Sequence, residues 1–329
     1  MSRPIVTIIT PTFNHQTVIK TCLESVVNQT FDAWEQIVID DGSDDNTWDI
    51  VQGCSAKCPK IIPIRSGHRG IWNLAELYNL ALQRSSGNYV AILEGDDWWP
   101  SNKLELQIPI HLDDNNILLS YGVAGIMENT ELKTMSLRPP FSTLTVTTSE
   151  FLKHLISLET YYEPVTVMMQ KEALLSIGGF QQIANFPAVD FPTFVALCKM
   201  PGTIAWLDEC LGYYRQHAEQ VTKSLGVEIA EGRYQIALGE FKATGDLFDK
   251  EEIAAAIRAH HRSLSDAYLA AVRYALIQHN AHNLDGLTRK LWTYGGVKRK
   301  LEAVYARIAV KQGWTLEPLL EVARTLSRR

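Results

Sequence analysis

The first hundred residues alternate between short apolar runs and longer segments whose apolar residues recur at helical spacing. Continuous apolar runs bounded by such segments are typical of strands in a parallel sheet that helices cover on both faces. The pattern therefore predicts an α/β domain. The expected strands span 5–9, 35–39, 60–64 and 88–93, and the expected helices span 16–27, 47–52 and 72–83.

From about Gly226 the pattern changes, because small and apolar residues recur at helical spacing without strand alternation. It predicts helices over 251–278 and 287–310. We therefore expect two domains, an α/β domain over 1–225 and a helical domain over 226–329.

The composition is that of an ordinary globular protein, with 46 % hydrophobic and 21 % charged residues in a chain of 329. No apolar stretch reaches the roughly 18 residues that a membrane-spanning helix needs. Polar residues follow the first apolar run too soon for a signal peptide. We therefore expect a soluble, cytoplasmic protein.

Charge is unevenly distributed along the chain. From Gly286 to Arg329 ten Lys or Arg stand against three Glu, so this tail carries +7 and leaves −13 on residues 1–285 for a net charge of −6. The acidic body argues against a nucleic-acid partner. Two interpretations of the tail stay open. Its helices pack on the first domain or on a second copy as a homodimer, or they rest on anionic lipid at the inner face of the membrane.

Acidic residues follow two of the predicted strands. Asp40 and Asp41 end one strand, and Glu94, Asp96 and Asp97 end another. Because ligands of parallel α/β sheets bind beyond the carboxyl ends of the strands, both clusters should open onto one crevice. Neither the GxGxxG turn of dinucleotide-binding enzymes nor a P-loop GxxxxGK(S/T) occurs in the chain, which disfavours both classes.

Five segments resemble, in order and spacing, the family-2 glycosyltransferases. These enzymes are inverting nucleotide-sugar transferases with a GT-A fold. The resemblance covers roughly residues 4–224 and implies a mostly parallel GT-A sheet flanked by helices, followed by a helical C-terminal region. The segments are VTIITPTFN (6–14), QIVIDDGSDDNT (36–47), GNYVAILEGDDWW (87–99), IGGF (177–180) and YYRQHAEQVTKS (213–224).

The stretch EGD (94–96) resembles the DXD motif of the family, with Glu in place of the first Asp. The resemblance implies that Asp96 binds Mg²⁺ or Mn²⁺, hard cations that prefer carboxylate oxygens and bridge them to phosphates. Three roles stay open for Asp97: it is a second ligand of the metal, it reaches the metal through water, or it orients a neighbouring residue. His217 matches the histidine of the YRxH segment of the family. It is the implied third ligand of the metal or a contact of the diphosphate.

The resemblance places the nucleotide at the ends of the first two strands. Asp41 is implied to accept a hydrogen bond from N3–H of the base, which uracil and thymine carry and cytosine lacks, so the expected donor is a UDP- or dTDP-sugar. Asp40 has an alternative role as a cap of the next turn, and Arg69 has one as an ordinary surface residue. The implied nucleotide-binding residues are Pro11, Thr12, Asn14, Asp40, Asp41, Arg69 and Asp96.

An inverting transfer needs a base that takes the proton of the acceptor hydroxyl group as it attacks the anomeric carbon. The family places an acid shortly after its GGF element, and Asp190 is the one acid between 177 and 198. We predict Asp190 as the general base, with a helix N-cap as the alternative role. The expected acceptor is a glycan or lipid-linked glycan in surface polysaccharide synthesis. Trp98 and Trp99 either stack on it or pack beneath the acidic loop.

Other classes of function stay open at this point. A retaining transferase or a nucleotidyltransferase could use a similar sheet, although the latter usually has a Gly-rich basic loop where this chain has TPTFNHQ (10–16). A non-catalytic module that binds sugar nucleotides is the third class. It stays open because Val189 and Pro192 depart from the usual surroundings of the acid after GGF.

Overall fold

The computed structural model describes residues 3–128, 131–141, 144–160, 162–217, 220, 224–244, 247–277, 284–296, 299–304 and 306. Two compact units follow each other along the chain, Met1–Lys223 and Ser224–Arg329. Within the described residues, the first unit holds every strand of the sheet and the second consists of helices.

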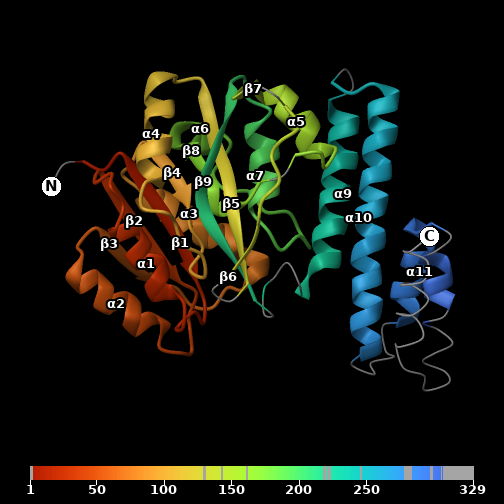
Figure 1. The fold of residues 1–329 in the computed structure, drawn as a ribbon, viewed down its shortest axis with the longest axis horizontal. Coiled ribbons are helices and arrows are strands. Elements are labelled where there is room, and N and C mark those ends of the chain that lie inside the picture. The colour runs from red at the N-terminus through yellow and green to blue at the C-terminus, as the bar shows by residue number, and fades with distance from the viewer. Residues whose placement is uncertain are drawn as a thin grey trace. The chain divides into compact units, whose positions relative to one another are not determined.

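The first unit is built on one mixed sheet with helices at its flanks (Figure 1). The N-terminal half of the sheet is parallel: β1 lies between β2 and β4, and β3 pairs with β2. All the strands and helices predicted for this half are present, with ends shifted by a few residues, and the predicted α/β fold is confirmed. Their bounds are β1 Val6–Thr12, α1 Ile19–Val27, β2 Trp34–Asp40, α2 Thr47–Lys57, β3 Ile61–Arg65, α3 Leu74–Arg84 and β4 Tyr89–Ile92.

The other half of the sheet contains antiparallel pairs. Strand β8 joins β4 to β5 and is antiparallel to both, whereas β5 and β9 are parallel. The order is β3-β2-β1-β4-β8-β5-β9-β7, and β6 pairs with β5. The bounds are α4 Lys103–Asp113, β5 Ile117–Glu128, β6 Glu131–Met135, β7 Thr145–Thr147, α5 Thr148–Ile156, β8 Met168–Gln170, α6 Lys171–Ser176, α7 Asp190–Leu197 and β9 Thr203–Gln216.

The central strands are covered on both faces, which explains why they consist of continuous apolar runs. Every residue of β1 and β2 is buried. Helix α1 buries Ile19, Cys22, Leu23 and Val26, a spacing that places all four on one face against the same core as Ile8. Full burial of one such aliphatic side chain stabilises the fold by about 1.5–3 kcal/mol. The core thus holds the carboxyl ends of β1, β2 and β4 in fixed positions.

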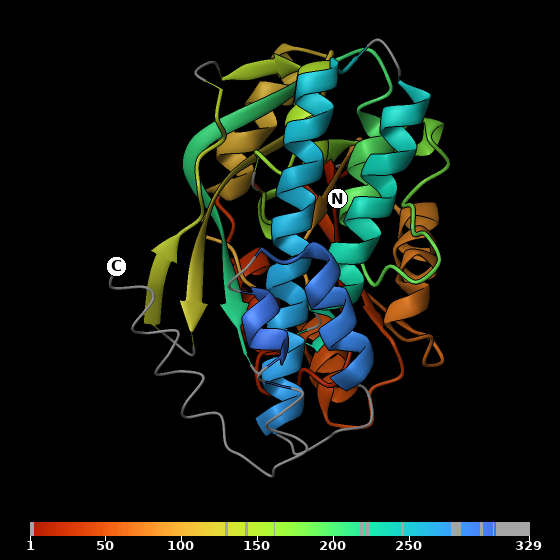
Figure 2. The same cartoon turned by 90° about the vertical axis from the view of Figure 1, so that its right-hand side faces the viewer.

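The second unit consists of α9 Gly226–Ala243, α10 Lys250–Ile277 and α11 Leu284–Tyr294, followed by helical residues 299–304. Helix α10 packs against both α9 and α11, as Figures 1 and 2 show. The helix expected over 287–310 is interrupted at Gly295. A Cβ atom there would lie 2.5 Å from the carbonyl oxygen of Leu291 and 2.4 Å from Cβ of Arg299. A side chain at this position would therefore clash with the chain on either side of the break.

The described part of the basic tail contributes to a core of its own. Leu284, Leu291 and Ala303 are buried together with Leu264 and Leu269 of α10. This packing is within the second unit, and both interpretations of the tail stay predictions. All five Lys and Arg residues after Tyr305 lie outside the described residues. Across the residues that the structure describes, no helix combines the length and apolar character that crossing a bilayer requires.

Removing one of these core side chains is expected to destabilise the second unit. Leu291 is 0 % exposed, so Leu291→Ala should lower the free energy of unfolding by about 2–5 kcal/mol, because it removes buried apolar contacts and leaves a cavity. The matched control is Leu301→Ala, at a leucine that is 62 % exposed, where a change within about 0.5 kcal/mol is expected. Thermal and urea unfolding of both variants measures the difference. Equal effects would contradict the packing described here.

Candidate active site

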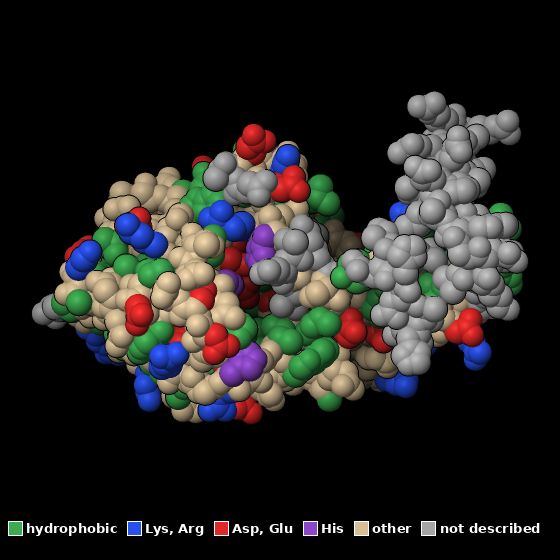
Figure 3. Space-filling model, turned by 90° about the horizontal axis from the view of Figure 1, so that it is seen from below, with side chains coloured by type: hydrophobic (Ala, Val, Ile, Leu, Met, Phe, Trp, Pro, Cys, Tyr) green, Lys and Arg blue, Asp and Glu red, His purple; other side chains and the backbone are tan. Residues whose placement is uncertain are grey.

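The carboxyl ends of β1, β2 and β4 meet at one edge of the sheet and line one cavity. Its volume is about 280 Å³. Thr12 lies opposite Asp40 in the parallel register of β1 and β2, which places the turn after β2 beside the end of β1. Figure 3 shows acidic and histidine side chains together in a hollow of the surface. Residues from all three strand ends and from β9 line the cavity, among them Pro11, Thr12, Phe13, His15, Asp41, His68, Glu94, Asp96, Tyr214 and His217.

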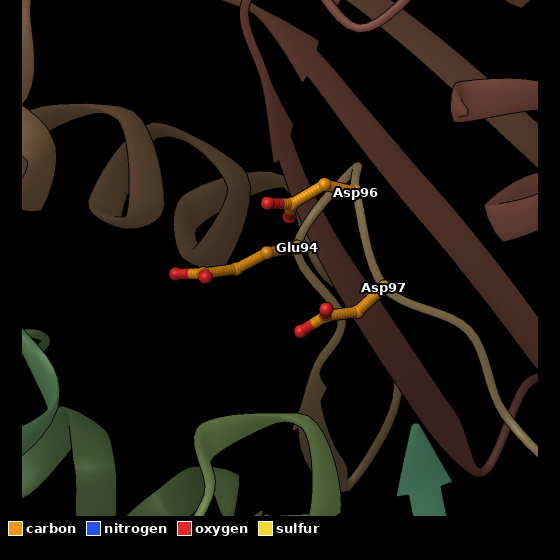
Figure 4. A group of neighbouring side chains, drawn as sticks. All are labelled: Glu94, Asp96 and Asp97. Carbon is orange, nitrogen blue, oxygen red and sulfur yellow. The ribbon is translucent and has the colours of Figure 1, made fainter. Parts of the chain in front are cut away.

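The loop after β4 gathers three carboxylates. One oxygen of each of Glu94, Asp96 and Asp97 lies within 4.8 Å of the others, and the three side chains project to the same side of the loop (Figure 4). Gly95 allows this loop to lie close to the end of β1. A Cβ atom at that position would lie 2.6 Å from Oγ1 of Thr12 and 2.8 Å from Nδ1 of His15. Only glycine therefore lets the acidic loop lie against the end of β1.

The last residues of β9 hold this loop from the other side. The backbone N–H of Arg215 donates to Oδ1 of Asp97 at 2.8 Å, and its Nε donates to the carbonyl oxygen of Asp96, also at 2.8 Å. Nε2 of His217 lies 3.1 Å from Oδ2 of Asp96. The structure thus brings together the two segments that carry the predicted metal ligands, 121 positions apart in the chain. The metal-binding role of His217 stays a prediction.

Burial and mutual repulsion act on the acids in different ways. Burial, together with the charges of Asp96 and Asp190, raises the pKa of Glu94 to about 8. Burial beside Asp96 and Glu94 raises the pKa of Asp97 well above its usual value. Burial opposes ionisation of Asp96 as well, but the hydrogen bond with His217, the nearby His15 and a backbone hydrogen bond together outweigh it and lower the pKa of Asp96. Crowded, partly desolvated carboxylate oxygens of this kind fit a hard divalent cation, which would relieve the repulsion between them.

Asp190 is the first residue of α7 and is partly buried. The N-cap position belongs to Val189, so Asp190 does not have the capping role considered as an alternative. After burial and nearer acids, its charge contributes to the raised pKa of Glu94 and Tyr78, as expected of a carboxylate near the acidic loop. Its role as a base stays a prediction.

At the ends of β1 and β2, Asp41 anchors a loop. Its carboxylate accepts hydrogen bonds from the backbone N–H groups of Arg69 at 2.8 Å and Gly70 at 2.9 Å. Nδ1 of His68 lies 3.1 Å from the same carboxylate, and the His68 ring stacks on Phe13 with 4.4 Å between centroids. Asp41, Pro11 and Thr12 line the cavity, as expected for nucleotide-binding residues.

Of the other nucleotide-binding candidates, Asp96 also lines this cavity, whereas Asn14, Asp40 and Arg69 do not. Asp40 is fully buried and accepts hydrogen bonds from the backbone N–H and the hydroxyl of Ser43. Its alternative role as a cap of the turn is therefore the one observed. Oδ1 of Asn14 accepts from the N–H of Asp44, so it shapes the same turn. The Arg69 guanidinium pairs with Glu76, and a contact with phosphate stays a prediction.

The two tryptophans after the acids have different surroundings. Trp99 is 3 % exposed, donates from Nε1 to the carbonyl oxygen of Val165 at 2.7 Å and carries Nζ of Lys103 over its ring at 4.3 Å. A ring so buried has no face for an acceptor sugar, so we assign Trp99 to the core. Trp98 is partly buried between the Tyr213 ring at 5.3 Å and the Arg215 guanidinium at 4.5 Å. An acceptor contact of Trp98 stays a prediction.

Several residues of the site were not predicted from the sequence. Phe13, His15 and His68 line the cavity although they belong to no acidic cluster. The hydroxyl of Tyr78 donates to Glu94 at 3.2 Å, and the charge of Glu163 contributes to the raised pKa of Glu94 and Asp97. Phe13 and His15 lie within TPTFNHQ (10–16), and His68 stands beside Arg69, which is the signal that could have found them. Tyr78 and Glu163 do not stand next to a segment that was singled out for the site, so no signal in the sequence pointed to them.

Comparison with known proteins adds sequence relatives. The family model for glycosyl transferase family 2 matches residues 7–178. A Bacillus subtilis (strain 168) protein named as a teichuronic acid biosynthesis glycosyltransferase, TuaG, is 29 % identical over 213 residues, 65 % of this chain and 79 % of that protein. An Escherichia coli protein named UDP-Glc:alpha-D-GlcNAc-diphosphoundecaprenol beta-1,3-glucosyltransferase WfgD is 37 % identical over 128 residues. That match covers 39 % of this chain and only 49 % of that protein.

Solved structures show the same fold at low sequence identity. Residues 1–349 of Staphylococcus aureus TarS, in complex with UDP-GlcNAc, match with a TM-score of 0.55 and 17 % identity over 94 % of this chain and 92 % of that chain. The mannosyltransferase PcManGT from Pyrobaculum calidifontis, in complex with GDP-Man and Mn²⁺, also matches with a TM-score of 0.55 and 17 % identity. This match covers 94 % of this chain and 87 % of that chain.

Proposed function

The chain belongs to glycosyl transferase family 2, and from this premise we propose that it is a metal-dependent inverting glycosyltransferase. It moves a sugar from a UDP- or dTDP-sugar to a hydroxyl group of a glycan or lipid-linked acceptor in surface polysaccharide synthesis. The proposal rests on one observation: Asp41, the acidic loop 94–97 and His217 lie around one cavity. The names of the relatives in Bacillus subtilis and Escherichia coli support the acceptor class.

The acidic loop has the ligands that a divalent cation needs. Asp96 and Asp97, with Glu94 and His217 beside them, would hold Mg²⁺ or Mn²⁺. Bound there, the cation would neutralise the negative charge that develops on the departing diphosphate. Arg215 and Gly95 fix the loop, in which Glu94 and Asp96 line the cavity.

Asp190 is proposed to take the proton of the acceptor hydroxyl group as its oxygen attacks the anomeric carbon. A C–O bond forms on one face of the sugar while the bond to the diphosphate breaks on the opposite face, which inverts the configuration. The charge of Asp190 acts on Glu94 across the site, which supports a position close to the donor. The nucleotide lies at the other end, against Phe13 and the loop that Asp41 anchors.

A panel of nucleotide sugars tests the proposal directly. We expect release of nucleoside diphosphate from UDP- or dTDP-sugars in the presence of Mn²⁺, and little or none from CDP- or GDP-sugars. Turnover confined to GDP-sugars would refute the proposed donor, and turnover that persists in excess EDTA would refute the metal dependence.

The nucleotide preference is expected to depend on Asp41. UDP and dTDP should bind about tenfold more tightly than CDP, because only their bases offer an N3–H to a carboxylate acceptor. Asp41→Asn should remove most of this preference, whereas Asp44→Asn, at an exposed carboxylate of the same turn, should retain it. Isothermal titration with the three diphosphates measures the affinities. Equal affinities in the native protein would refute the assignment.

The second unit presents the surface proposed for peripheral contact. Trp292, Leu301 and Val304 are exposed, and Nζ of Lys300 lies 5.3 Å from the centre of the Trp292 ring. An anionic membrane or a second copy of the chain would contact these residues. Lipid contact should give sedimentation with anionic vesicles that weakens as salt shortens the Debye length from about 10 Å at 0.1 M to about 3 Å at 1 M. A homodimer should instead double the mass in light scattering without added lipid.

A further inference from the structure

Gln182 lies between a wall of the cavity and the loop that carries Asp190. Its side-chain oxygen Oε1 accepts a hydrogen bond from the backbone N–H of Ala75 at 3.1 Å. Its Nε2 donates to the carbonyl oxygens of Ile71 at 2.8 Å and Phe186 at 3.1 Å. Both N–H bonds and the oxygen of the amide are therefore engaged. One side chain joins three separate points of the backbone.

Two of these partners belong to the cavity wall. Ile71 lines the cavity, and Ala75 lies in the first turn of α3, which also lines it. The first amides of a helix have no partner within the helix, so Gln182 satisfies one of them from 107 positions away. The same wall is also held at residues 69–70, because the Asp41 carboxylate accepts hydrogen bonds from the backbone N–H groups of these two residues.

The third partner belongs to the loop that leads into α7. Phe186 is fully buried, and Asp190 begins the helix shortly after it. The end of this loop is fixed as well, because Oγ1 of Thr193 accepts from the N–H of Gln181 at 2.9 Å and donates to the carbonyl oxygen of Val189. Gln182 and Gln181 therefore hold the loop that leads to Asp190 at two points, Phe186 and Thr193.

We propose that Gln182 is a positioning residue that sets Asp190 against the bound donor. The inference rests on the proposed function, because the role of Asp190 as a base is part of it. The three hydrogen bonds of Gln182 join the cavity wall at Ile71 and Ala75 to the loop that leads to Asp190. Without them, the two segments can shift relative to each other. A displacement of about 1 Å between reacting groups can lower the rate on the order of 10²-fold.

The matched variants are Gln182→Leu and Gln181→Leu. Gln181 donates from Nε2 to the carbonyl oxygens of Ile177 and Gly179 in its own turn, so its loss removes two hydrogen bonds without separating distant segments. Without ligand, backbone amide exchange over 71–76 and 183–190 should be about fivefold faster or more in Gln182→Leu. It should be unchanged there in Gln181→Leu.

Turnover provides the readout that a merely structural role would not change. Hydrolysis of UDP-glucose and UDP-N-acetylglucosamine with Mn²⁺ should slow about tenfold or more in Gln182→Leu, with KM within about a factor of two of the native value. Gln182→Glu keeps the acceptor for Ala75 and loses both donors. Gln182→Glu should show faster backbone amide exchange over 183–190 and the same loss of turnover. This variant is the test if Gln182→Leu does not fold.

Unchanged exchange over 183–190 in the Gln182 variants would overturn the inference. Faster exchange with native turnover would overturn it too, because Gln182 would then be structural only. A native protein that hydrolyses no UDP- or dTDP-sugar would instead refute the proposed function, and the exchange measurements would still decide whether Gln182 joins the two segments.

Discussion

Replacing Asp96 with alanine is expected to abolish sugar transfer, with a loss of about 10³-fold or more in turnover, and to weaken donor binding in the presence of Mg²⁺ or Mn²⁺. Among the three acids of the loop, Asp96 is the one whose pKa is lowered, and its Oδ2 lies 3.1 Å from Nε2 of His217. It is therefore the carboxylate best suited to stay ionised beside a cation. Transfer assays and titration of UDP with and without metal measure both effects.

The loss should not come from unfolding. Asp96 contributes to the raised pKa of Glu94 and Asp97, so its removal relieves repulsion among buried acids, and the melting temperature without metal should not fall. Asp44→Ala removes an exposed carboxylate of the turn after β2 and should retain transfer. Native turnover in Asp96→Ala would show that the acidic loop holds no essential cation.

Asp190→Asn is expected to lower kcat by about 10²-fold or more while UDP binds with native affinity, because the amide keeps the shape of the side chain and cannot accept the proton. Asp190→Glu retains the carboxylate and displaces it, so its kcat should lie between those of the native and asparagine proteins. Single-turnover measurements with saturating donor separate the chemical step from binding. An unchanged kcat in Asp190→Asn would assign the proton to another acid of the cavity, such as Glu94.

The parallel half of the fold could be predicted because its strands are buried on both faces and alternate with helices at regular spacing. The antiparallel half could not. Strand β8 has three residues, Met168–Gln170, and its pairing with β4 and β5 is decided by contacts between distant segments. Nothing in the local spacing of apolar residues carries that information. The break at Gly295 was visible only as an interruption of the helical pattern.

The two acidic clusters could be located because carboxyl ends of parallel strands meet at one edge. The pairing of Asp96 with His217 followed only from the resemblance, since the two residues lie 121 positions apart. Adjacent residues of the same type also have different surroundings. Asp41 lines the cavity, while Asp40 is buried and bonded to Ser43. Trp99 is in the core, while Trp98 stacks on Tyr213. Such neighbours share one sequence context, and only the packing of the turn or loop decides which of them faces the cavity.

The crowding of Glu94, Asp96 and Asp97 would also link folding to the proposed cation. An ion that binds only the folded protein stabilises it by RT ln(1 + [L]/Kd), about 2.7 kcal/mol at a concentration of 100 Kd. Three carboxylate oxygens within 4.8 Å of one another would bind such an ion only when the loop is folded, since the unfolded chain does not hold them together. Melting temperatures measured across Mg²⁺, Mn²⁺ and Ca²⁺ should therefore rank the metals by affinity before any donor sugar or acceptor is identified.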